Sequence, residues 1–356
     1  MTQTRDNGNK WTFKWSLSAP TQDPFLLIDF ENESRVLLFD CGVRIWGRLK
    51  TILKLEHLFI THAHIDHIIG FDHIVRSLLG ESAVLHIHGP EGIIDRLSSK
   101  LNGYDWDRSA EQELILEINE YAGGRRTTQT HACNRRFATT GPAVIAPWQG
   151  PIVREKSFSV YAVPVDHGGS NCHAYVMKEI DYARIHKELL EQLGEEPGPW
   201  VGELLQCFND NELDGRMIQT GRGAYDAVRL AEDLIRVQKG RTVVYITDTV
   251  FQESWLSDLA AVAEGADLVV CESTFLEEDG DLAETYHHLT SVQAARIARK
   301  LHADRLMLFH ISSRYHPQIF RAVQEARTIF PNTDIVQPAG RRKPRTRLIP
   351  PANSSG

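Results

Sequence analysis

Short apolar runs that end in a polar residue recur along most of this chain of 356 residues. Four of them have the length and composition of a buried strand, at residues 58–60, 163–165, 243–246 and 306–309. Strand-like segments also lie at 25–29 and 35–39, and residues 151–178 fit two strands. Apolar positions at helical spacing follow the first run, and residues 65–100 read as helix, strand and helix. This alternation predicts an α/β fold.

The segment after the first run holds four metal-binding side chains within six positions. Residues 61–67 read Thr-His-Ala-His-Ile-Asp-His. Alternation along the strand aims His62 and His64 the same way, because side chains two apart share a face. Asp66 and His67 follow at the start of the predicted helix and can address a second point nearby. Imidazole suits zinc and similar metals and a carboxylate adds an anionic ligand, so the segment favours two adjacent metal ions over one.

Three other apolar runs also end in residues that bind metals. His167 follows the run at 163–165 and precedes two glycines, Asp248 follows the run at 243–246, and His310 follows the run at 306–309. Ligands of α/β proteins gather where buried strands end. We therefore expect these side chains to meet the 61–67 segment at one edge of a sheet.

Together these segments resemble the metallo-β-lactamase superfamily and, within it, the ribonuclease Z (tRNase Z) branch. Residues 39–42 (Phe-Asp-Cys-Gly) match the FDCG strand end of the superfamily, and residues 88–92 resemble its GPxG strand exit. Residues 272–274, 288–291 and 310–315 are similar to the EAT, HST-type and HFSxRY segments of the ribonuclease Z branch. The resemblance implies an αββα sandwich, in which helices flank two mixed β-sheets, with an inserted arm.

The resemblance also implies the roles of the metal-binding residues. One metal ion would be held by His62, His64 and His167, the other by Asp66, His67 and His310, and Asp248 would bridge them. Zinc is the expected metal, two ions per chain, with manganese as the alternative. Two cations about 3.5–4 Å apart can activate a shared water and neutralise a phosphoryl oxygen. Asp66 would both bind metal and orient the nucleophile.

The same resemblance implies that His288 is the general acid. It precedes Thr290-Ser291-Val292-Gln293, a capping-box pattern that starts a helix. Cleavage of a phosphodiester needs a proton for the leaving oxygen, which histidine supplies near neutral pH. Glu272 would hold the other ring nitrogen of His288, and the adjacent His287 is expected to have no role.

Residues 179–239 interrupt the strand pattern and fit an inserted arm. The segments on either side of it, 1–178 and 240–340, together form the expected catalytic domain, and a basic tail follows at 341–356. Residues 197–205 resemble the PGPxxGxLK segment of the ribonuclease Z arm that clasps tRNA. Gly198 and Gly202 in this segment, and Ser312 and Arg314 in the 310–315 stretch, are the expected substrate-binding residues.

Two features depart from the family pattern. The arm carries seven Lys and Arg residues against thirteen Asp and Glu residues, whereas phosphate-binding surfaces usually have the opposite balance. The PxKxRN loop of the family is replaced by Ser-Ala-Pro-Thr-Gln-Asp at residues 18–23. The metal-binding pattern is complete, but the substrate-binding segments are altered.

Composition fits an ordinary globular enzyme, with 42% hydrophobic and 24% charged residues and a net charge of −8. No apolar run near 18 residues and no signal peptide is found, so no membrane association is expected. The five scattered cysteines favour reduced thiols and a cytoplasmic location. The resemblance implies a homodimer.

The sequence favours a zinc-dependent phosphodiesterase that removes the 3′ trailer of precursor tRNA. The first alternative uses the same metal chemistry on a small molecule: a cyclic nucleotide, an aryl sulfate or a lactone. The second alternative, a non-catalytic binding protein, is disfavoured because every ligand position is filled.

Overall fold

The structure is a computed structural model that describes residues 12–31, 33–42 and 49–336; the predicted basic tail at 341–356 lies outside them. The chain divides into two compact units. The larger lies within residues 1–153, 160–176 and 243–356, and the smaller within residues 154–159 and 177–242.

The first sheet of the larger unit contains eight strands in chain order, from β1 to β8. Strands β3 to β6 run parallel to one another, and the remaining pairs are antiparallel, so the sheet is mixed. The strands are β1 (Phe13–Leu17), β2 (Leu26–Phe30), β3 (Val36–Phe39), β4 (Leu55–Phe59), β5 (Val84–Pro90), β6 (Ile115–Ala122), β7 (Arg125–Ala132) and β8 (Val144–Pro147).

Four helices accompany this sheet: α1 (Leu49–Ile52), α2 (Ile65–Ile68), α3 (Phe71–Leu78) and α4 (Ile93–Asn102). A short 3₁₀ helix, η1 (Cys133–Arg135), follows β7. Apolar residues of the sheet and of α2, α3 and α4 form one buried cluster, which includes Leu58, Phe71, Ile87 and Leu97. The predicted order of helix, strand and helix over residues 65–100 is therefore confirmed.

The second sheet contains seven strands in the order β19-β18-β17-β16-β11-β10-β9. They are β9 (Val153–Arg154), β10 (Phe158–His167), β11 (Ser170–Glu179), β16 (Thr242–Ile246), β17 (Leu268–Glu272), β18 (Leu306–Phe309) and β19 (Thr333–Ile335). Its helices are α8 (Glu253–Ala263), α9 (Gly280–Tyr286), α10 (Ser291–Lys300) and α11 (Phe320–Arg327), with 3₁₀ helices η2 (Glu277–Asp279) and η3 (Ser313–Tyr315). Apolar residues of these helices and strands form a second buried cluster, which includes Val244, Leu259, Ile297 and Leu308.

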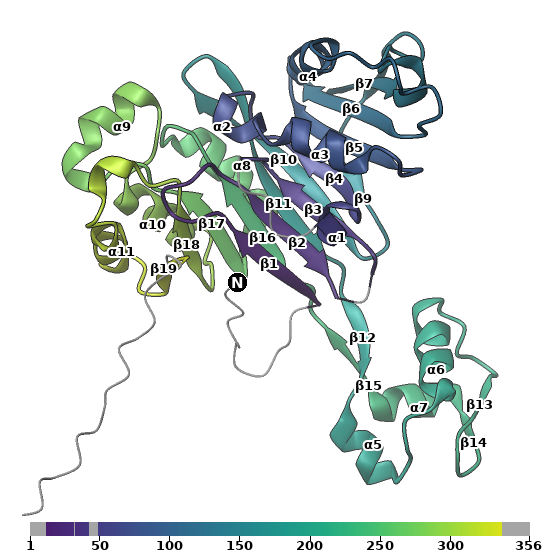
Figure 1. Cartoon of the computed structure of the whole chain (residues 1–356). Coiled ribbons are helices and arrows are strands. Elements are labelled where there is room, and N and C mark those ends of the chain that lie inside the picture. The colour runs from purple at the N-terminus through teal and green to yellow at the C-terminus, as the bar shows by residue number, and fades with distance from the viewer. Residues whose placement is uncertain (1–11, 32, 43–48, 337–356) are drawn as a thin grey trace, which may run out of the picture. The chain divides into compact units, whose positions relative to one another are not determined.

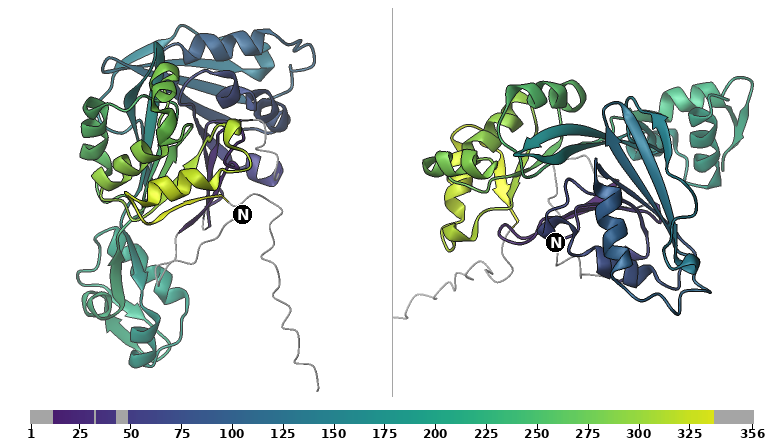
Figure 2. Two further views of the ribbon diagram at one scale, coloured as in Figure 1. Left: turned by 90° about the vertical axis from the view of Figure 1, so that its left-hand side faces the viewer. Right: turned by 90° about the horizontal axis from the view of Figure 1, so that it is seen from above.

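Aromatic side chains join the two sheets. Phe39 of β3 lies 5.9 Å, centroid to centroid, from both Tyr175 of β11 and Tyr245 of β16, and Phe59 of β4 lies 5.5 Å from Tyr175. These rings are almost fully buried. The two sheets therefore face each other with the helices outside, which is the predicted αββα sandwich (Figures 1 and 2).

The smaller unit has its own apolar core. Strand β12 (Tyr182–Ile185) pairs with β15 (Ile235–Gln238), and β13 (Met217–Gln219) pairs with β14 (Ala224–Asp226), both antiparallel. Helices α5 (Lys187–Leu193), α6 (Pro199–Asn209) and α7 (Ala227–Leu234) complete the unit. Trp200, Leu204, Ile218 and Leu230 are buried between these elements.

Two further predictions can be compared with this structure. All five cysteines are buried and free, as expected for reduced thiols. Within residues 12–31, 33–42 and 49–336, no helix is both long enough and apolar enough to cross a membrane.

Candidate active site

The 61–67 segment lies where β4 of the first sheet ends and α2 begins. His62 is fully buried, His64 is exposed, and their ring centroids are 4.4 Å apart, so both rings address the same region as predicted. Asp66 and His67 lie within the short helix α2, and His67 is fully buried. One tight connection thus presents all four side chains.

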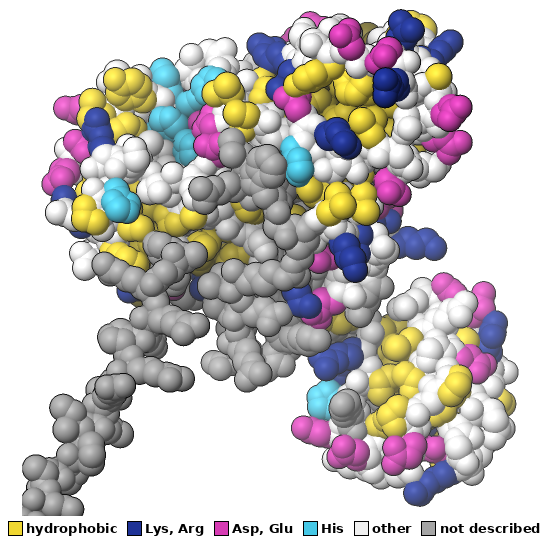
Figure 3. Space-filling view, viewed as in Figure 1, with side chains coloured by type: hydrophobic (Ala, Val, Ile, Leu, Met, Phe, Trp, Pro, Cys, Tyr) yellow, Lys and Arg dark blue, Asp and Glu magenta, His cyan; other side chains and the backbone are white. Residues whose placement is uncertain are grey.

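The second sheet supplies the other three predicted ligands from three strand ends. His167 is the last residue of β10, Asp248 follows β16 and His310 follows β18. The backbones of Asp248 and His310 are left-handed, with φ of 29° and 52°. Such values cost energy in residues other than glycine and are concentrated at functional sites. The chain turns sharply here and presents these side chains at the sheet edge, where histidines gather on the surface (Figure 3).

The seven side chains form two groups, and within each group the ligand atoms all lie within 4.8 Å of one another. The first group is His62, His64, His167 and Asp248, and the second is Asp66, His67 and His310; a third set, Asp248, Glu272, His288 and His310, shares a member with each. Oδ2 of Asp248 is 3.5 Å from Nε2 of His62 and 3.3 Å from Nε2 of His67. Asp248 therefore lies between the two groups.

Two buried ring nitrogens test whether this site fits a metal. Nε2 of His62 and Nε2 of His67 have no hydrogen-bond partner among the described residues. Buried polar atoms are almost always paired, so two unpaired nitrogens beside buried carboxylates require an explanation. Imidazole nitrogens that face carboxylates are the donors that zinc and related metals take. The residues present fit a metal ion.

His288 lies beside these groups, between α9 and α10. Its Nδ1 is 3.0 Å from Oε2 of Glu272, the fully buried last residue of β17. Glu272 also accepts hydrogen bonds from the backbone N–H of Thr249 and the hydroxyl of Thr274, which fix the carboxylate. The predicted capping box is present, because Thr290 and Gln293 bond reciprocally at the start of α10. His288 is thus held on a short loop by a buried carboxylate.

The charges of the site shift the pKa of its titratable groups. Burial alone would lower the pKa of His288, but the charge and hydrogen bond of Glu272 raise it to about 9. Burial would raise the pKa of Asp248, but the nearby imidazoles of His310 and His67 hold it well below its usual range. At neutral pH the site therefore contains an ionised aspartate next to a protonated His288.

Known proteins are similar to this chain in sequence and in fold. Residues 231–311 match a family model described as a beta-lactamase superfamily domain. The metallo-beta-lactamase fold protein YhfI from Bacillus subtilis superposes with a TM-score of 0.53 at 17% identity, covering 91% of this chain and 97% of that one. Ribonuclease Z of Geobacillus kaustophilus is 32% identical over 305 residues, which are 84% of this chain and 85% of that protein. Ribonuclease Z of Deinococcus radiodurans is 30% identical over 322 residues, covering 88% of this chain and 95% of that protein.

The chain belongs to the ribonuclease Z family. It has the metallo-β-lactamase fold, is a hydrolytic enzyme and belongs to a metal-binding family, as predicted from the sequence. The non-catalytic alternative is thereby excluded.

Asp40 was not among the site residues expected from the sequence, yet it contacts the site of this ribonuclease Z family member. Asp40 follows β3, is fully buried and accepts hydrogen bonds from the backbone and hydroxyl of Thr61. Its Oδ2 lies 2.9 Å from Nδ1 of His67 and 3.1 Å from the Tyr245 hydroxyl. A carboxylate that bonds the far nitrogen of a metal-binding histidine fixes its tautomer and orientation. The sequence feature that could have identified Asp40 is its position as a lone aspartate at the end of an apolar strand, within the FDCG segment.

The expectation that His287 has no role stays a prediction for its side chain, but its backbone contacts the site. Its backbone carbonyl lies 2.9 Å from Nδ1 of His167 and orients that ring. The left-handed backbone of His287, with φ of 57°, turns the chain toward His167 as α9 ends.

The expected substrate-binding residues lie in both units. Ser312 caps η3, and the exposed Arg314 lies 5.6 Å from the ring of Phe275 and 3.8 Å from a carboxylate oxygen of Asp279. Gly198 in the smaller unit precedes α6 in an extended conformation. Gly202 lies on the exposed face of α6.

Proposed function

We propose that this ribonuclease Z family member is an endoribonuclease that removes the 3′ trailer of precursor tRNA by metal-assisted hydrolysis of one phosphodiester. The observation that carries the proposal is the convergence of seven ligand side chains beside a histidine paired with a buried glutamate. The relatives named ribonuclease Z, similar over most of both chains, support the choice of RNA as substrate.

The proposed metal set is two zinc ions. His62, His64 and His167 would hold one, Asp66, His67 and His310 the other, and Asp248 both. When bound, such a pair supplies an activated water and stabilises negative charge on the phosphoryl group.

Asp66 is the proposed orienter of the nucleophile. Its side chain is one-third exposed, and its Oδ2 lies 3.2 Å from Nε2 of His310. Burial raises its pKa, but the hydrogen bond from His310 and the imidazole charges lower it to about 2. Asp66 is therefore a carboxylate at neutral pH and can accept a hydrogen bond from the attacking water.

His288 is the proposed general acid. Its Nδ1 is engaged by Glu272, while the described residues offer no hydrogen-bond partner to its Nε2. A pKa of about 9 keeps the ring protonated at neutral pH. The Nε2–H group can then donate its proton to the leaving oxygen, and Glu272 stabilises the charged ring until it does so.

The smaller unit is proposed to clasp the body of the tRNA, as the resemblance of residues 197–205 implies. Its net negative charge means that backbone amides around residues 194–202 and a few arginines would make the contacts. The homodimer implied by the resemblance remains part of this proposal, and light scattering of the purified protein tests it.

A small-molecule diester or ester is the second candidate substrate, and two observations favour it. Residues 18–23 replace the PxKxRN loop, and the 179–239 segment has thirteen acidic against seven basic residues. Acidic side chains are visible on the surface of the smaller unit (Figure 3). A cyclic nucleotide, aryl sulfate or lactone would need no such contacts.

One comparison distinguishes the two candidates. The same zinc-loaded preparation is given precursor tRNA, an unstructured RNA of equal length and bis(p-nitrophenyl) phosphate. We expect kcat/KM to be highest for precursor tRNA, with cleavage at one position on the 3′ side of the tRNA body. Equal kcat/KM for precursor tRNA and unstructured RNA would overturn the tRNA proposal in favour of the small-molecule hydrolase.

A further inference from the structure

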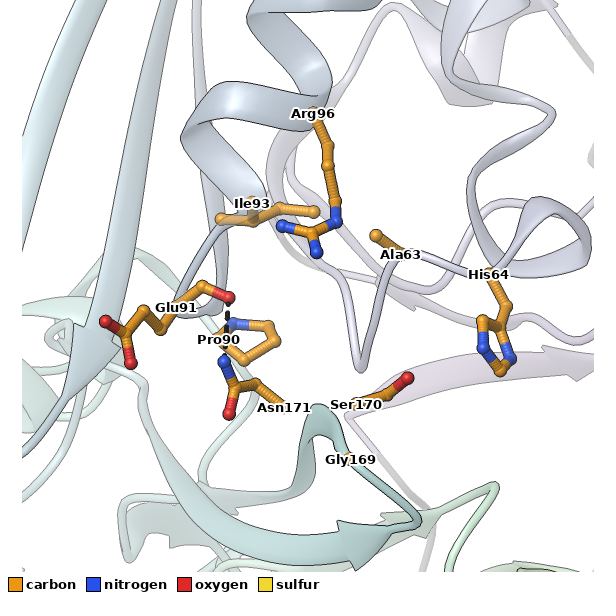
Figure 4. Close-up of a pocket in the computed structure, with 9 residues that line it drawn as sticks. All are labelled: Ala63, His64, Pro90, Glu91, Ile93, Arg96, Gly169, Ser170 and Asn171. Carbon is orange, nitrogen blue, oxygen red and sulfur yellow. Dashed lines mark hydrogen bonds between the residues drawn. The ribbon is translucent and has the colours of Figure 1, made fainter.

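Two neighbouring cavities of the larger unit lie near the metal-binding groups, and His64 lines the smaller of them. The smaller, about 150 Å³, is lined by His64, Arg96 and the turn between β10 and β11 (Figure 4). The larger, about 780 Å³, shares five of those lining residues, namely Pro90, Glu91, Gly169, Ser170 and Asn171. Its size is in the range of sites for small ligands. The larger cavity therefore adjoins the smaller one, which in turn is lined by His64 of the proposed metal site.

Arg96 brings a positive charge to the smaller cavity, which Glu91 also lines. Among the described residues no carboxylate lies within ion-pair distance of its guanidinium, although the carbonyl of Gly92 accepts a hydrogen bond from Nη1 at 2.8 Å. A Cβ at Gly92 would stand 2.1 Å from that nitrogen, so glycine allows the guanidinium to lie against the backbone. Figure 4 shows the guanidinium between Ile93 and Ala63, on the side of the pocket that leads to His64. A held arginine with unused donors is suited to a phosphate.

The larger cavity has a different chemistry. Tyr121 and Trp148 line it in edge-to-face contact, with centroids 5.2 Å apart. Its charged lining residues are Glu91, Asp166 and Asp258, and none of its described lining residues is Lys or Arg. Such a pocket repels phosphate but suits an aromatic ring with amino groups, because aromatic side chains stack on bases and carboxylates accept from exocyclic amines.

Two lining residues of this cavity hold unused hydrogen-bonding atoms. Nδ1 of His173 and Nε1 of Trp148 are buried and have no hydrogen-bond partner among the described residues. His173 is only 3% exposed. Buried polar atoms without partners mark places where a ligand or water completes the structure.

We propose that the two cavities form a nucleotide subsite for the residue next to the scissile phosphate. Arg96 binds the adjacent phosphate, and the base enters the larger cavity against Trp148, where an exocyclic amine meets Asp258. A base with an exocyclic amino group (adenine, cytosine or guanine) is preferred at this position over uracil. This proposal rests on the proposed function, because the nucleotide that occupies the subsite is part of the RNA substrate.

Binding of mononucleotides tests the subsite without turnover. Zinc-loaded full-length protein is titrated by calorimetry with AMP, IMP and ribose 5-phosphate. AMP should bind at least about 5-fold more tightly than ribose 5-phosphate, the low end of a base stacking contribution. It should also bind more tightly than IMP, which lacks the amino group, and Asp258→Asn should reduce that preference.

Three variants separate the contacts. Trp148→Ala should abolish the advantage of AMP over ribose 5-phosphate, whereas Trp148→Phe should retain most of it and covers the case in which the alanine variant fails to fold. Arg96→Gln should weaken both ligands by the same factor, roughly 10-fold for a hydrogen bond to a charged group. Arg125→Gln is the control: Arg125 is an exposed arginine at the start of β7 that lines neither cavity, so its loss should change the affinity for neither ligand.

The outcomes are distinct. Equal affinity for AMP and ribose 5-phosphate, or a Trp148→Phe variant that loses the difference, would overturn the base pocket. An unchanged Arg96→Gln variant would mean that the phosphate binds elsewhere, and equal affinity for AMP and IMP would remove the role of Asp258. Failure of the proposed function appears separately, as absence of preference for precursor tRNA with the mononucleotide pattern intact.

Discussion

Nδ1 of His67 lies 2.9 Å from Oδ2 of Asp40, and neither side chain is exposed to solvent. The contact joins the end of β3 to the segment after β4 and leaves Nε2 of His67 directed to the site. Asp40→Asn should therefore lower zinc affinity about 10–100-fold, the usual effect of losing such an outer contact. Competition with a chromogenic chelator measures the zinc affinity of the variant and of the wild type.

Asp29→Asn is the control for this prediction. Asp29 lies on β2, partly exposed and 3.7 Å from Lys54, so its loss should leave zinc affinity unchanged. Wild-type affinity in the Asp40→Asn variant would show that the His67 ring is held by its packing instead.

The proposed pair of metal ions predicts a stoichiometry. Protein purified without chelator should contain close to two equivalents of zinc or manganese by elemental analysis. Asp66→Ala removes a ligand and the orienter of the nucleophile, so turnover should be abolished while the circular dichroism spectrum is retained. Active protein that is free of metal would refute the proposal.

His288→Ala should keep its metal and slow cleavage by about 10²–10⁴, the usual contribution of a general acid. His287→Asn is the matched control, because it retains the backbone carbonyl that contacts His167, and asparagine tolerates a left-handed backbone. Metal content and kcat are measured on the same samples. Loss of metal from His288→Ala would identify His288 as a ligand. The experiment can distinguish the two roles because His288 lies close enough to Asp248 and His310 to share a metal ion with them.

His173 predicts a loss of stability in acid. Burial lowers its pKa from 6.5 to about 4. Below pH 6.5 the unfolded chain binds a proton at this position and the folded chain does not, so stability is present above pH 6.5 and is lost as pH falls toward 4. The loss is about 2 kcal/mol between pH 6.5 and 5, at 1.4 kcal/mol per unit.

Urea unfolding of wild type and His173→Leu at pH 7.5, 6.5 and 5 checks this. The difference between the two proteins isolates His173 from the other histidines, and the variant should lose less stability on acidification. Parallel pH profiles would mean that His173 is protonated equally in both states.

The smaller unit can be removed at a defined point. Tyr182 and Gln238 face each other in the β12–β15 pair, so residues 183–237 can be replaced by Asn-Gly, which favours a two-residue hairpin. If the unit clasps tRNA, KM for precursor tRNA should rise while hydrolysis of bis(p-nitrophenyl) phosphate is unchanged, because a remote contact contributes binding energy only. The intact protein should show a shallow salt dependence of KM, since few counterions are released. An unchanged KM for precursor tRNA would contradict the clasping role.

Much of the fold and of the ligand set could be predicted from the sequence because their signals are local. The 61–67 segment carries its own strand end and helix start, and the Thr290 capping box spans four residues. The contacts of Asp40 with His67 and of His287 with His167 could not be predicted, because they depend on how distant segments pack. Arg96 gave no signal for the same reason, since only folding brings α4 near the β10–β11 turn.

The seven proposed ligands are spread along the chain from His62 to His310, and no fragment that ends before β18 contains them all. A nascent chain on the ribosome therefore lacks one of the seven proposed donors until residue 310 has been synthesised. The proposed metal set can therefore be completed only after strands β1 to β18, which belong to both sheets and to the smaller unit, have been synthesised.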